Sequence, residues 1–98
     1  AIKDGRYYLV VKSKSSNTAS IDKSTWVEFS RDYIILKEGN TTTTILYNSE
    51  DRSFEKDGII YRFTDDHGDL SISDMVSHES VSYVSTESSM FSKYEKGK

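Results

Sequence analysis

The chain has 98 residues, a formal net charge of −3 and no cysteine. That length predicts a single domain spanning residues 1–98. The acidic balance argues against a nucleic-acid partner, which would need a basic stripe to displace counterions. The absence of cysteine fits a cytosolic protein and a bacterial surface protein equally well.

The apolar fraction of 35% is low for a globular protein, but the aromatic residues, 12% of the chain, stand mostly in strand-like runs. Disordered chains lack such runs, so a folded domain is expected. No stretch of about 18 apolar residues is present, and no helix is expected to span a membrane. The chain starts at Ala1 without a methionine and shows no signal peptide, which suggests a mature or trimmed form.

The first strand is predicted over residues 6–12. Apolar side chains alternate onto both of its faces, with Tyr7, Leu9 and Val11 on one and Tyr8 and Val10 on the other. A strand with two apolar faces is expected to be central or covered on both sides. The polar residues 13–24 lack periodicity and predict a long flexible loop. This loop is either a simple connector or a flap over a binding mouth, held in part by Ile21.

Three further strands are predicted over residues 25–29, 33–37 and 41–47. The turns between them are rich in Gly, Asn, Asp and Ser, which favour turn conformations. The last of the three opens with the threonines 41–44, whose β-branched side chains favour an extended backbone.

The stretch from Ser53 to Phe63 is the most strongly patterned part of the chain. Asp57-Gly58 tolerates the positive φ values that a two-residue type I′ turn needs, and such a turn fixes the strand register. The pairs expected are Lys56 with Ile59, Glu55 with Ile60, Phe54 with Tyr61 and Ser53 with Arg62. One face of this hairpin is then apolar, which predicts a core hairpin of an antiparallel sheet.

The remaining third of the chain is patterned more weakly. Residues 70–73 and 81–83 alternate as two further strands, and residues 90–94 are expected to form a closing strand. Residues 95–98 are expected to form a polar C-terminal tail. No stretch shows apolar residues at i, i+3, i+4 and i+7 with caps, so no helix is predicted.

Together these elements predict an all-β fold, an antiparallel up-and-down meander of about eight strands closed as a small barrel, with a β-sandwich as the alternative. An eight-stranded barrel is just wide enough to be filled by side chains or to hold one small ligand. The side chains expected in the barrel interior are large: Tyr7, Phe29, Phe54, Tyr61 and Phe63. A filled interior is therefore favoured over a hollow one.

Several short motifs resemble those of small bacterial lipocalin-like (calycin-type) lipoprotein domains. They are Gly5-Arg6-Tyr7-Tyr8-Leu9-Val10, Trp26-Val27-Glu28-Phe29-Ser30, Asp57-Gly58-Ile59-Ile60-Tyr61, Gly68-Asp69-Leu70-Ser71-Ile72 and Met90-Phe91-Ser92-Lys93-Tyr94. Tyr7 stands where lipocalins carry Trp. The resemblance implies an up-and-down barrel on the extracellular face of a Gram-positive cell envelope, linked to the membrane only through a lipid anchor upstream of residue 1. A cytoplasmic location is the alternative, and the resemblance implies no known ligand.

Candidate chemistry is sparse. Residues 65–69 could offer oxygen ligands to a hard cation, but Asp and Gly are also typical of a hairpin turn, and the turn is favoured. His67 and His78 lack further ligands at a spacing that suits zinc, so no metal site and no cofactor are expected. No strained nucleophile turn of the Gly-x-Ser-x-Gly type is present, so no catalytic residue is assigned and no enzyme is predicted.

Tyr8, Trp26 and Tyr33 are expected to be exposed aromatic residues, and together with Ile21 they are the candidate ligand or partner surface. The function expected is a non-enzymatic binding or interaction module of the bacterial cell envelope, with an unknown protein as partner. The alternative is a carrier of a small hydrophobic ligand in a barrel cavity under the loop 13–24. An OB-like or SH3-like module is disfavoured by the strand count and the acidic charge.

Overall fold

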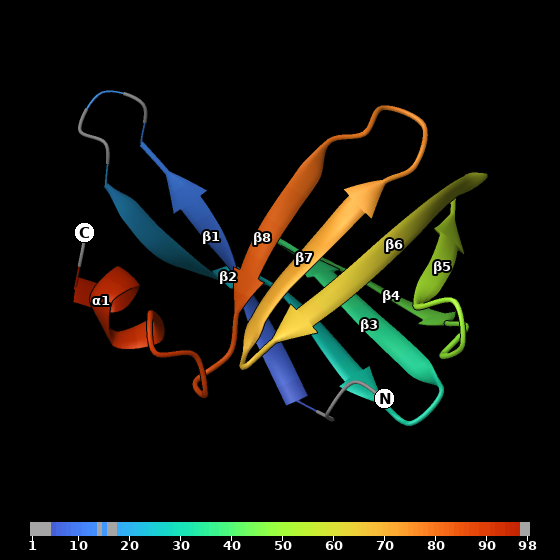
Figure 1. The fold of residues 1–98 in the computed structure, drawn as a ribbon, viewed down its shortest axis with the longest axis horizontal. Helices are drawn as coiled ribbons and strands as arrows, with labels where there is room; N and C mark the ends of the chain where they lie inside the picture. Colours follow the sequence, from blue (N-terminus) through green and yellow to red (C-terminus); the bar gives the residue numbers. More distant parts are fainter. Residues whose placement is uncertain (1–4, 14, 16–17, 97–98) are drawn as a thin grey trace.

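The computed structural model describes residues 5–13, 15 and 18–96, which form eight strands and one short helix (Figure 1). The strands are β1 (Gly5–Lys12), β2 (Ala19–Ser30), β3 (Tyr33–Glu38), β4 (Thr41–Leu46), β5 (Ser53–Lys56), β6 (Ile59–Asp66), β7 (Asp69–Asp74) and β8 (Ser80–Val84), and the helix is α1 (Phe91–Lys96).

The strands form one antiparallel sheet that curls into a nearly closed barrel. Its order is β4-β3-β2-β1-β8-β7-β6-β5, so strands that follow one another in sequence pair, and β1 also pairs with β8. The exception is a seam between β4 and β5, which is bridged only at one end, where Asn48 and Ser53 exchange backbone hydrogen bonds. The predicted all-β meander is confirmed, with this one open seam.

The hairpin of β5 and β6 has the predicted register. Ser53 pairs with Arg62, Phe54 with Tyr61, Glu55 with Ile60 and Lys56 with Ile59. Asp57 and Gly58 have φ values of 55° and 79°, which are those of a type I′ turn. The turn residues therefore set which side chains of this hairpin face the barrel interior.

The barrel interior is packed with aromatic and aliphatic side chains. The buried cluster consists of Tyr7, Val27, Phe29, Ile34, Leu36, Phe54, Phe63, Leu70 and Ile72. Phe29 lies at its centre, with ring centroids 5.8 Å from Tyr7, 5.5 Å from Tyr47 and 5.1 Å from Phe63. Edge-to-face and tilted rings at these distances are favourable arrangements of aromatic pairs.

The prediction of a loop over residues 13–24 is wrong for its second half. β2 begins at Ala19, and residues 13 and 18 are joined by a backbone hydrogen bond of 2.8 Å that closes a short connection. Residues 14, 16 and 17 lie outside the described residues. The polar composition misled the prediction because β2 contains a large bulge: Tyr8 pairs with Trp26 but the next residue, Leu9, pairs with Asp22.

The side chain of Asp22 stabilises this bulge. Its carboxylate accepts hydrogen bonds from the Ser24 hydroxyl at 2.6 Å, the Ser24 backbone N–H at 2.9 Å and the Thr25 hydroxyl at 3.4 Å. The Lys37 ammonium donates to the Ser24 carbonyl at 3.1 Å from the neighbouring strand. Polar residues that resemble a loop in the sequence therefore satisfy the hydrogen bonds of an irregular strand.

The predicted closing strand over residues 90–94 is also wrong, since this segment forms α1. The buried Ser88 hydroxyl donates to the Asp69 carboxylate at 2.5 Å and accepts from the Met90 backbone N–H at 3.1 Å, so the chain turns just before the helix. A helix of six residues is too short to show apolar periodicity. The expected polar tail also begins later, because Glu95 and Lys96 belong to α1 and residues 97–98 lie outside the described residues.

Tertiary contacts hold α1 against the outside of β1 and β2 (Figure 1). The Phe91 ring lies 6.1 Å from the Tyr8 ring, and Lys23 on β2 forms an ion pair of 2.6 Å with Glu95. The helix therefore covers part of the outer face of the sheet.

Candidate functional site

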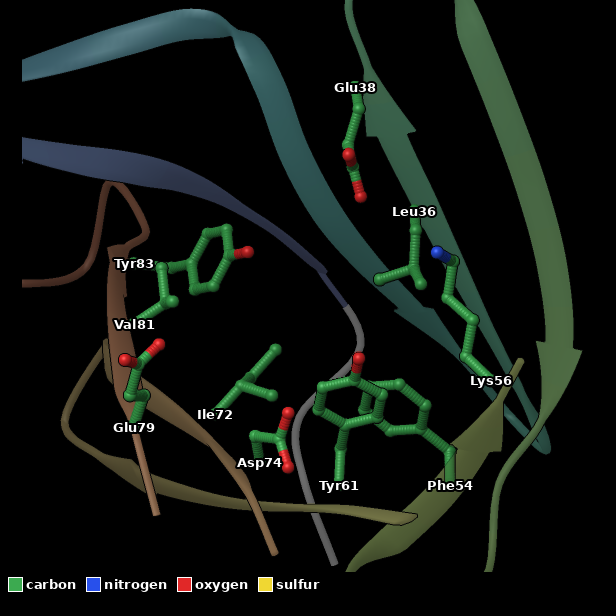
Figure 2. Close-up of a pocket in the computed structure, with 10 residues that line it drawn as sticks. All are labelled: Leu36, Glu38, Phe54, Lys56, Tyr61, Ile72, Asp74, Glu79, Val81 and Tyr83. Atoms are coloured by element: carbon green, nitrogen blue, oxygen red, sulfur yellow. The ribbon is translucent and has the colours of Figure 1, made fainter. Parts of the chain in front are cut away.

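A cavity of about 240 Å³ lies inside one end of the barrel (Figure 2). This end carries the turns after β3, β5 and β7, and also the connection between β1 and β2. We call it the mouth. The deeper wall of the cavity is apolar and aromatic, formed by Leu36, Phe54, Tyr61, Ile72 and Tyr83. The rim is charged, formed by Glu38, Lys56, Asp74 and Glu79, and the exposed Val81 lies at the opening beside them.

Strand alternation produces this layered wall. On β3 the apolar Leu36 is followed two positions later by Glu38, and on β7 Ile72 is followed by Asp74. Residues two apart on a strand point to the same side of the sheet. Because both strands run toward the mouth, the apolar side chain lies deeper and the charged side chain lies at the rim. Phe54 and Lys56 repeat the pattern on β5.

Glu38 and Tyr83 reach into the cavity from β3 and β8. In Figure 2 the Glu38 carboxylate and the Tyr83 hydroxyl point into the same space, with Tyr61 and Phe54 beside it. Burial, and then the negative charge of Glu38, raises the pKa of Tyr83 to about 12. The Tyr83 hydroxyl is therefore protonated at neutral pH and can donate a hydrogen bond toward the cavity.

The other rim charges are held by local hydrogen bonds. The Asp74 carboxylate accepts from the backbone N–H groups of Val76 at 2.8 Å and Ser77 at 3.1 Å, and these bonds lower the pKa of Asp74. The Lys56 ammonium lies 3.2 Å from the Asp57 carboxylate, and that hydrogen bond raises the pKa of Lys56. Both groups therefore carry their full charge at neutral pH.

The cavity ends where the aromatic core begins. The Phe54 and Tyr61 rings stack with centroids 5.1 Å apart and an interplanar angle of 15°, and Phe54 lies 6.3 Å from Phe63 in the core. The barrel is thus filled over its deeper part and open at its mouth. The prediction of a filled interior therefore applies to the deeper part of the barrel and not to its mouth.

A second hollow, of about 170 Å³, adjoins the mouth at the open seam. It is lined by Leu36, Glu38, Thr41, Thr43 and Lys56. Three of these residues also line the mouth cavity, so the two spaces are neighbours across the Glu38 and Lys56 side chains. The mouth cavity is therefore bordered by a second hollow on the side of the seam.

A third hollow, of about 290 Å³, lies on the outside of the barrel beside α1. Its lining includes Tyr94 of α1 and the side chains of Thr64, Asp66, Ser71 and Ser82, which alternate with core residues along their strands. Several of its polar side chains, such as Lys12, Thr64 and Asp66, are exposed to solvent. We regard the mouth cavity as the better candidate, because binding sites combine an apolar wall with a few convergent polar groups.

The opposite end of the barrel contains a buried polar pair. Burial raises the pKa of the Tyr7 phenol, and a hydrogen bond with Asp65 raises it further. One carboxylate oxygen of Asp65, Oδ1, is buried without a hydrogen-bond partner among the described residues. Next to Asp65, residues 66–69 form the hairpin turn that was favoured over a cation site. Within the described ranges, no group of three or more His, Cys, Asp and Glu side chains is arranged to hold a metal ion.

The structure separates the four residues of the predicted partner surface. Tyr8 and Trp26 are register partners on the outer face, but Tyr8 contacts α1 and the Arg6 guanidinium lies 3.8 Å above the Trp26 ring. Ile21 is only 6% exposed, so it is not part of an open surface. Tyr33 is 49% exposed at the far end of β3, next to Leu46 of β4.

The residues predicted for the interior lie together. Tyr7, Phe29, Phe54 and Phe63 belong to the buried cluster, and Tyr61 packs against it while lining the mouth. The charged rim was not predicted from the sequence. The signal that could have found it is the repeated pattern of an apolar residue followed two positions later by a charged one at a strand end.

Comparisons with protein-family models, with curated proteins and with solved structures returned no match. The nearly closed antiparallel barrel is compatible with the lipocalin-like fold that the short motifs imply. In the part of the chain that is described, no helix is long and apolar enough to cross a membrane. The function is therefore argued from the geometry of the mouth.

Proposed function

We propose that this protein is a non-enzymatic binding module that takes a small amphipathic ligand into the mouth of its barrel. The observation that carries the proposal is the cavity of about 240 Å³, in which an apolar and aromatic wall lies beneath a charged rim. Such a combination allows the wall to bury an apolar group while the rim orients a polar one.

The composition of the wall favours binding over catalysis. None of the described side chains that line the cavity is a Ser, Cys or His placed against a base, which is the arrangement that nucleophilic catalysis requires. The charged groups Asp74 and Lys56 are engaged in hydrogen bonds within their own turns. These side chains are suited to holding a fixed electrostatic field around a ligand.

The size of the cavity limits the ligand. A volume of about 240 Å³ corresponds to roughly eight water molecules, at about 30 Å³ of liquid volume each. An apolar cavity of roughly 150 Å³ accommodates benzene, so a single ring with a short chain fits here. The cavity is too small for a long acyl chain unless the chain leaves through the seam. If the protein is a carrier, which was the alternative prediction, its hydrophobic ligand must therefore be compact. The cavity does not lie under the predicted loop, since no described residue of 13–24 lines it.

A thermal-shift screen of small single-ring compounds tests the proposal. At a ligand concentration of ten times Kd, we expect Tm to rise by roughly 5–10 °C. The Val81→Trp variant places a large side chain at the opening of the cavity and should abolish the rise. Ile60→Trp is the matched control, because Ile60 is exposed on the outer face of β6. A screen without any shift, or shifts that survive Val81→Trp, would contradict the proposal.

A protein-interaction function is the second candidate, and one observation favours it. Tyr33 and Leu46 are register partners and are 49% and 65% exposed, so they form an apolar pair on the outer face. Exposed aromatic residues are enriched at interfaces. Pull-down with surface extracts should then recover a partner that the Tyr33→Ser, Leu46→Ser variant loses. Equal recovery by both forms would exclude this pair as the interface.

The location at a bacterial envelope is proposed on the resemblance of the strand motifs alone. In that proposal the protein is a lipoprotein on the extracellular face of a Gram-positive cell, held by a lipid anchor upstream of residue 1. Fractionation of the source cells, with labelling by a fatty-acid analogue, tests it. We expect labelled protein in the membrane fraction. Unlabelled protein in the cytosol would support the alternative location.

A further inference from the structure

We infer that the ligand of the mouth cavity is an organic cation, an amine attached to a compact apolar or aromatic body. This inference rests on the proposed function and adds the chemical class of the ligand. It is carried by three features of the same cavity: the balance of charge at its rim, the aromatic rings in its wall and its small size.

The rim is negative. Three carboxylates, Glu38, Asp74 and Glu79, line the cavity with one ammonium group, that of Lys56. The Lys56 ammonium is already paired with Asp57, whose carboxylate lies 3.2 Å away outside the cavity lining. The lining of the mouth therefore has an excess of negative charge, which attracts cations and repels anions.

The charge of Glu38 extends across the opening. It acts on the Tyr83 phenol of β8, whose pKa it helps to raise, and it is among the charges that raise the pKa of Lys56 on β5. Glu38 therefore lies between the two walls of the mouth, as Figure 2 shows, where an ammonium group could approach it from the cavity.

The wall beneath the rim suits the rest of such a ligand. Phe54 and Tyr61 present a stacked pair of rings, and Tyr83 presents a third ring, with Ile72 between the two walls. An ammonium group close to aromatic faces is stabilised by cation–π attraction, which is strongest when the cation is partly desolvated. The apolar body of the ligand can pack on the same rings.

Other ligand classes match the site less well. A carboxylate or phosphate ligand would face three like charges, and the one opposite charge is already paired. A neutral apolar ligand would fit the wall but would leave the ionised rim without a partner. An amine satisfies both layers of the cavity at once.

The test measures the affinities of three ligands with similar single-ring bodies: 2-phenylethylamine, 2-phenylethanol and 3-phenylpropionate. Titrations followed by NMR at low ionic strength and neutral pH should give the order amine, alcohol, carboxylate. Adding salt should weaken binding of the amine and leave binding of the alcohol unchanged, because salt screens only the charged interaction.

Two variants locate the effect. The double variant Glu38→Gln, Glu79→Gln should weaken binding of the amine by up to about fivefold for each carboxylate removed, the range of partly exposed ion pairs. The double variant keeps Asp74, because its carboxylate accepts backbone hydrogen bonds that stabilise the turn after β7. Glu55→Gln makes the same chemical change on the outer face of β5 and should not alter the affinity.

The outcomes separate this inference from the proposed function. If the alcohol or the carboxylate binds as tightly as the amine, and Val81→Trp blocks it, the proposed function holds and the inference of a cation is wrong. Equal affinities of the amine for the native protein and for the double variant would also overturn the inference. If none of the three ligands binds, the inference of a cation is wrong, and the wider thermal-shift screen of single-ring compounds decides the proposed function.

Discussion

Among the described glycines, Gly68 has the least room for a side chain. It lies in the turn between β6 and β7 with φ of 93°. A Cβ atom there would lie 2.6 Å from the Ser88 backbone nitrogen and 2.8 Å from the Ser85 hydroxyl. Ser85 and Ser88 are the buried residues of the segment that leads to α1, and the Ser85 backbone N–H donates to the Gly68 carbonyl at 2.9 Å. The turn at Gly68 therefore packs against this segment.

Two glycine-to-alanine variants separate crowding from backbone strain. Gly39 also has a positive φ, 61°, but nothing lies within 4 Å of its added Cβ. We expect Gly39→Ala to cost about 1–2 kcal/mol of unfolding free energy from strain alone. Gly68→Ala should cost about 1–3 kcal/mol more, because the surrounding backbone must move. Urea unfolding of both variants measures the difference, and equal costs would show that the segment at Ser88 moves freely.

Gly58 tests the turn that sets the register of β5 and β6. Its φ is 79° with open space around it, so only strain opposes a side chain. We expect Gly58→Val to lower the free energy of unfolding by about 2 kcal/mol, because a β-branched residue is strained at positive φ. Gly58→Asn is the control and should cost much less, since Asn tolerates this conformation. Thermal unfolding measures the Tm of each variant. Equal Tm values for Gly58→Val and Gly58→Asn would contradict the type I′ turn.

For single residues, strand alternation predicted which side chains face the barrel interior, but it did not predict which of the other side chains are exposed. Tyr7 and Phe63 could be assigned inward because one face of each strand had to be buried. Ile21 could not be placed, since a bulge in β2 breaks the alternation between Asp22 and Trp26.

Among the elements, the bulge in β2 and the turn after β7 are each stabilised by an aspartate. Hydrogen bonds from Ser24 lower the pKa of Asp22, and backbone hydrogen bonds from Ser77 and Val76 lower that of Asp74. A carboxyl with a lowered folded-state pKa contributes stability above its unfolded pKa, about 4. That contribution is lost as the pH falls through the folded-state value.

We therefore expect stability to decline below about pH 4. The Asp22→Asn, Asp74→Asn double variant should be less stable than the native chain at pH 7, and the two should converge in acid, where the native carboxyls are protonated. Urea unfolding at neutral pH and at about pH 2.5 makes the comparison. A difference in stability that is equal at both pH values would show that the charges of these carboxylates contribute nothing.

The two edges of the seam differ in how they are protected. β4 (Thr41–Leu46) contains no charged residue, whereas β5 is shorter and contains Glu55 and Lys56. An unpaired edge without charges is a site for pairing with another chain. We expect Thr44→Lys on β4 to reduce light scattering of concentrated, heated samples, with a change in stability within about 0.5 kcal/mol.

Thr64→Lys on β6 is the control for that variant, because Thr64 is also exposed but pairs with Ser71 of β7 and does not lie on an edge of the seam. It should leave the scattering unchanged. Equal reduction by both variants would mean that net charge, rather than the edge of β4, governs association.

α1 is the element that the sequence could least predict. Its six residues are held by contacts with distant parts of the chain, Phe91 with Tyr8 and Glu95 with Lys23. Short helices are marginal by themselves and depend on such packing. The same residues have strand-like alternation, so local pattern favoured the wrong element.

For the whole molecule, the meander and its strand order follow from short turns between successive strands, and these were predictable. The position of the seam was not, because it depends on how far β4 and β5 diverge after their bridge at Asn48 and Ser53. The mouth cavity arises from the same divergence and from the distance between β3 and β8. Those are properties of the closed barrel, and no single strand encodes them.

The central claim is that the mouth of the barrel is a binding site. Its most direct test is a chemical-shift map of the protein titrated with 2-phenylethylamine. We expect the largest shifts at Leu36, Tyr61, Ile72, Val81 and Tyr83, which line the cavity, and none at the outer pair Tyr33 and Leu46. Shifts centred on the outer pair, or no shifts at saturating ligand, would contradict the account.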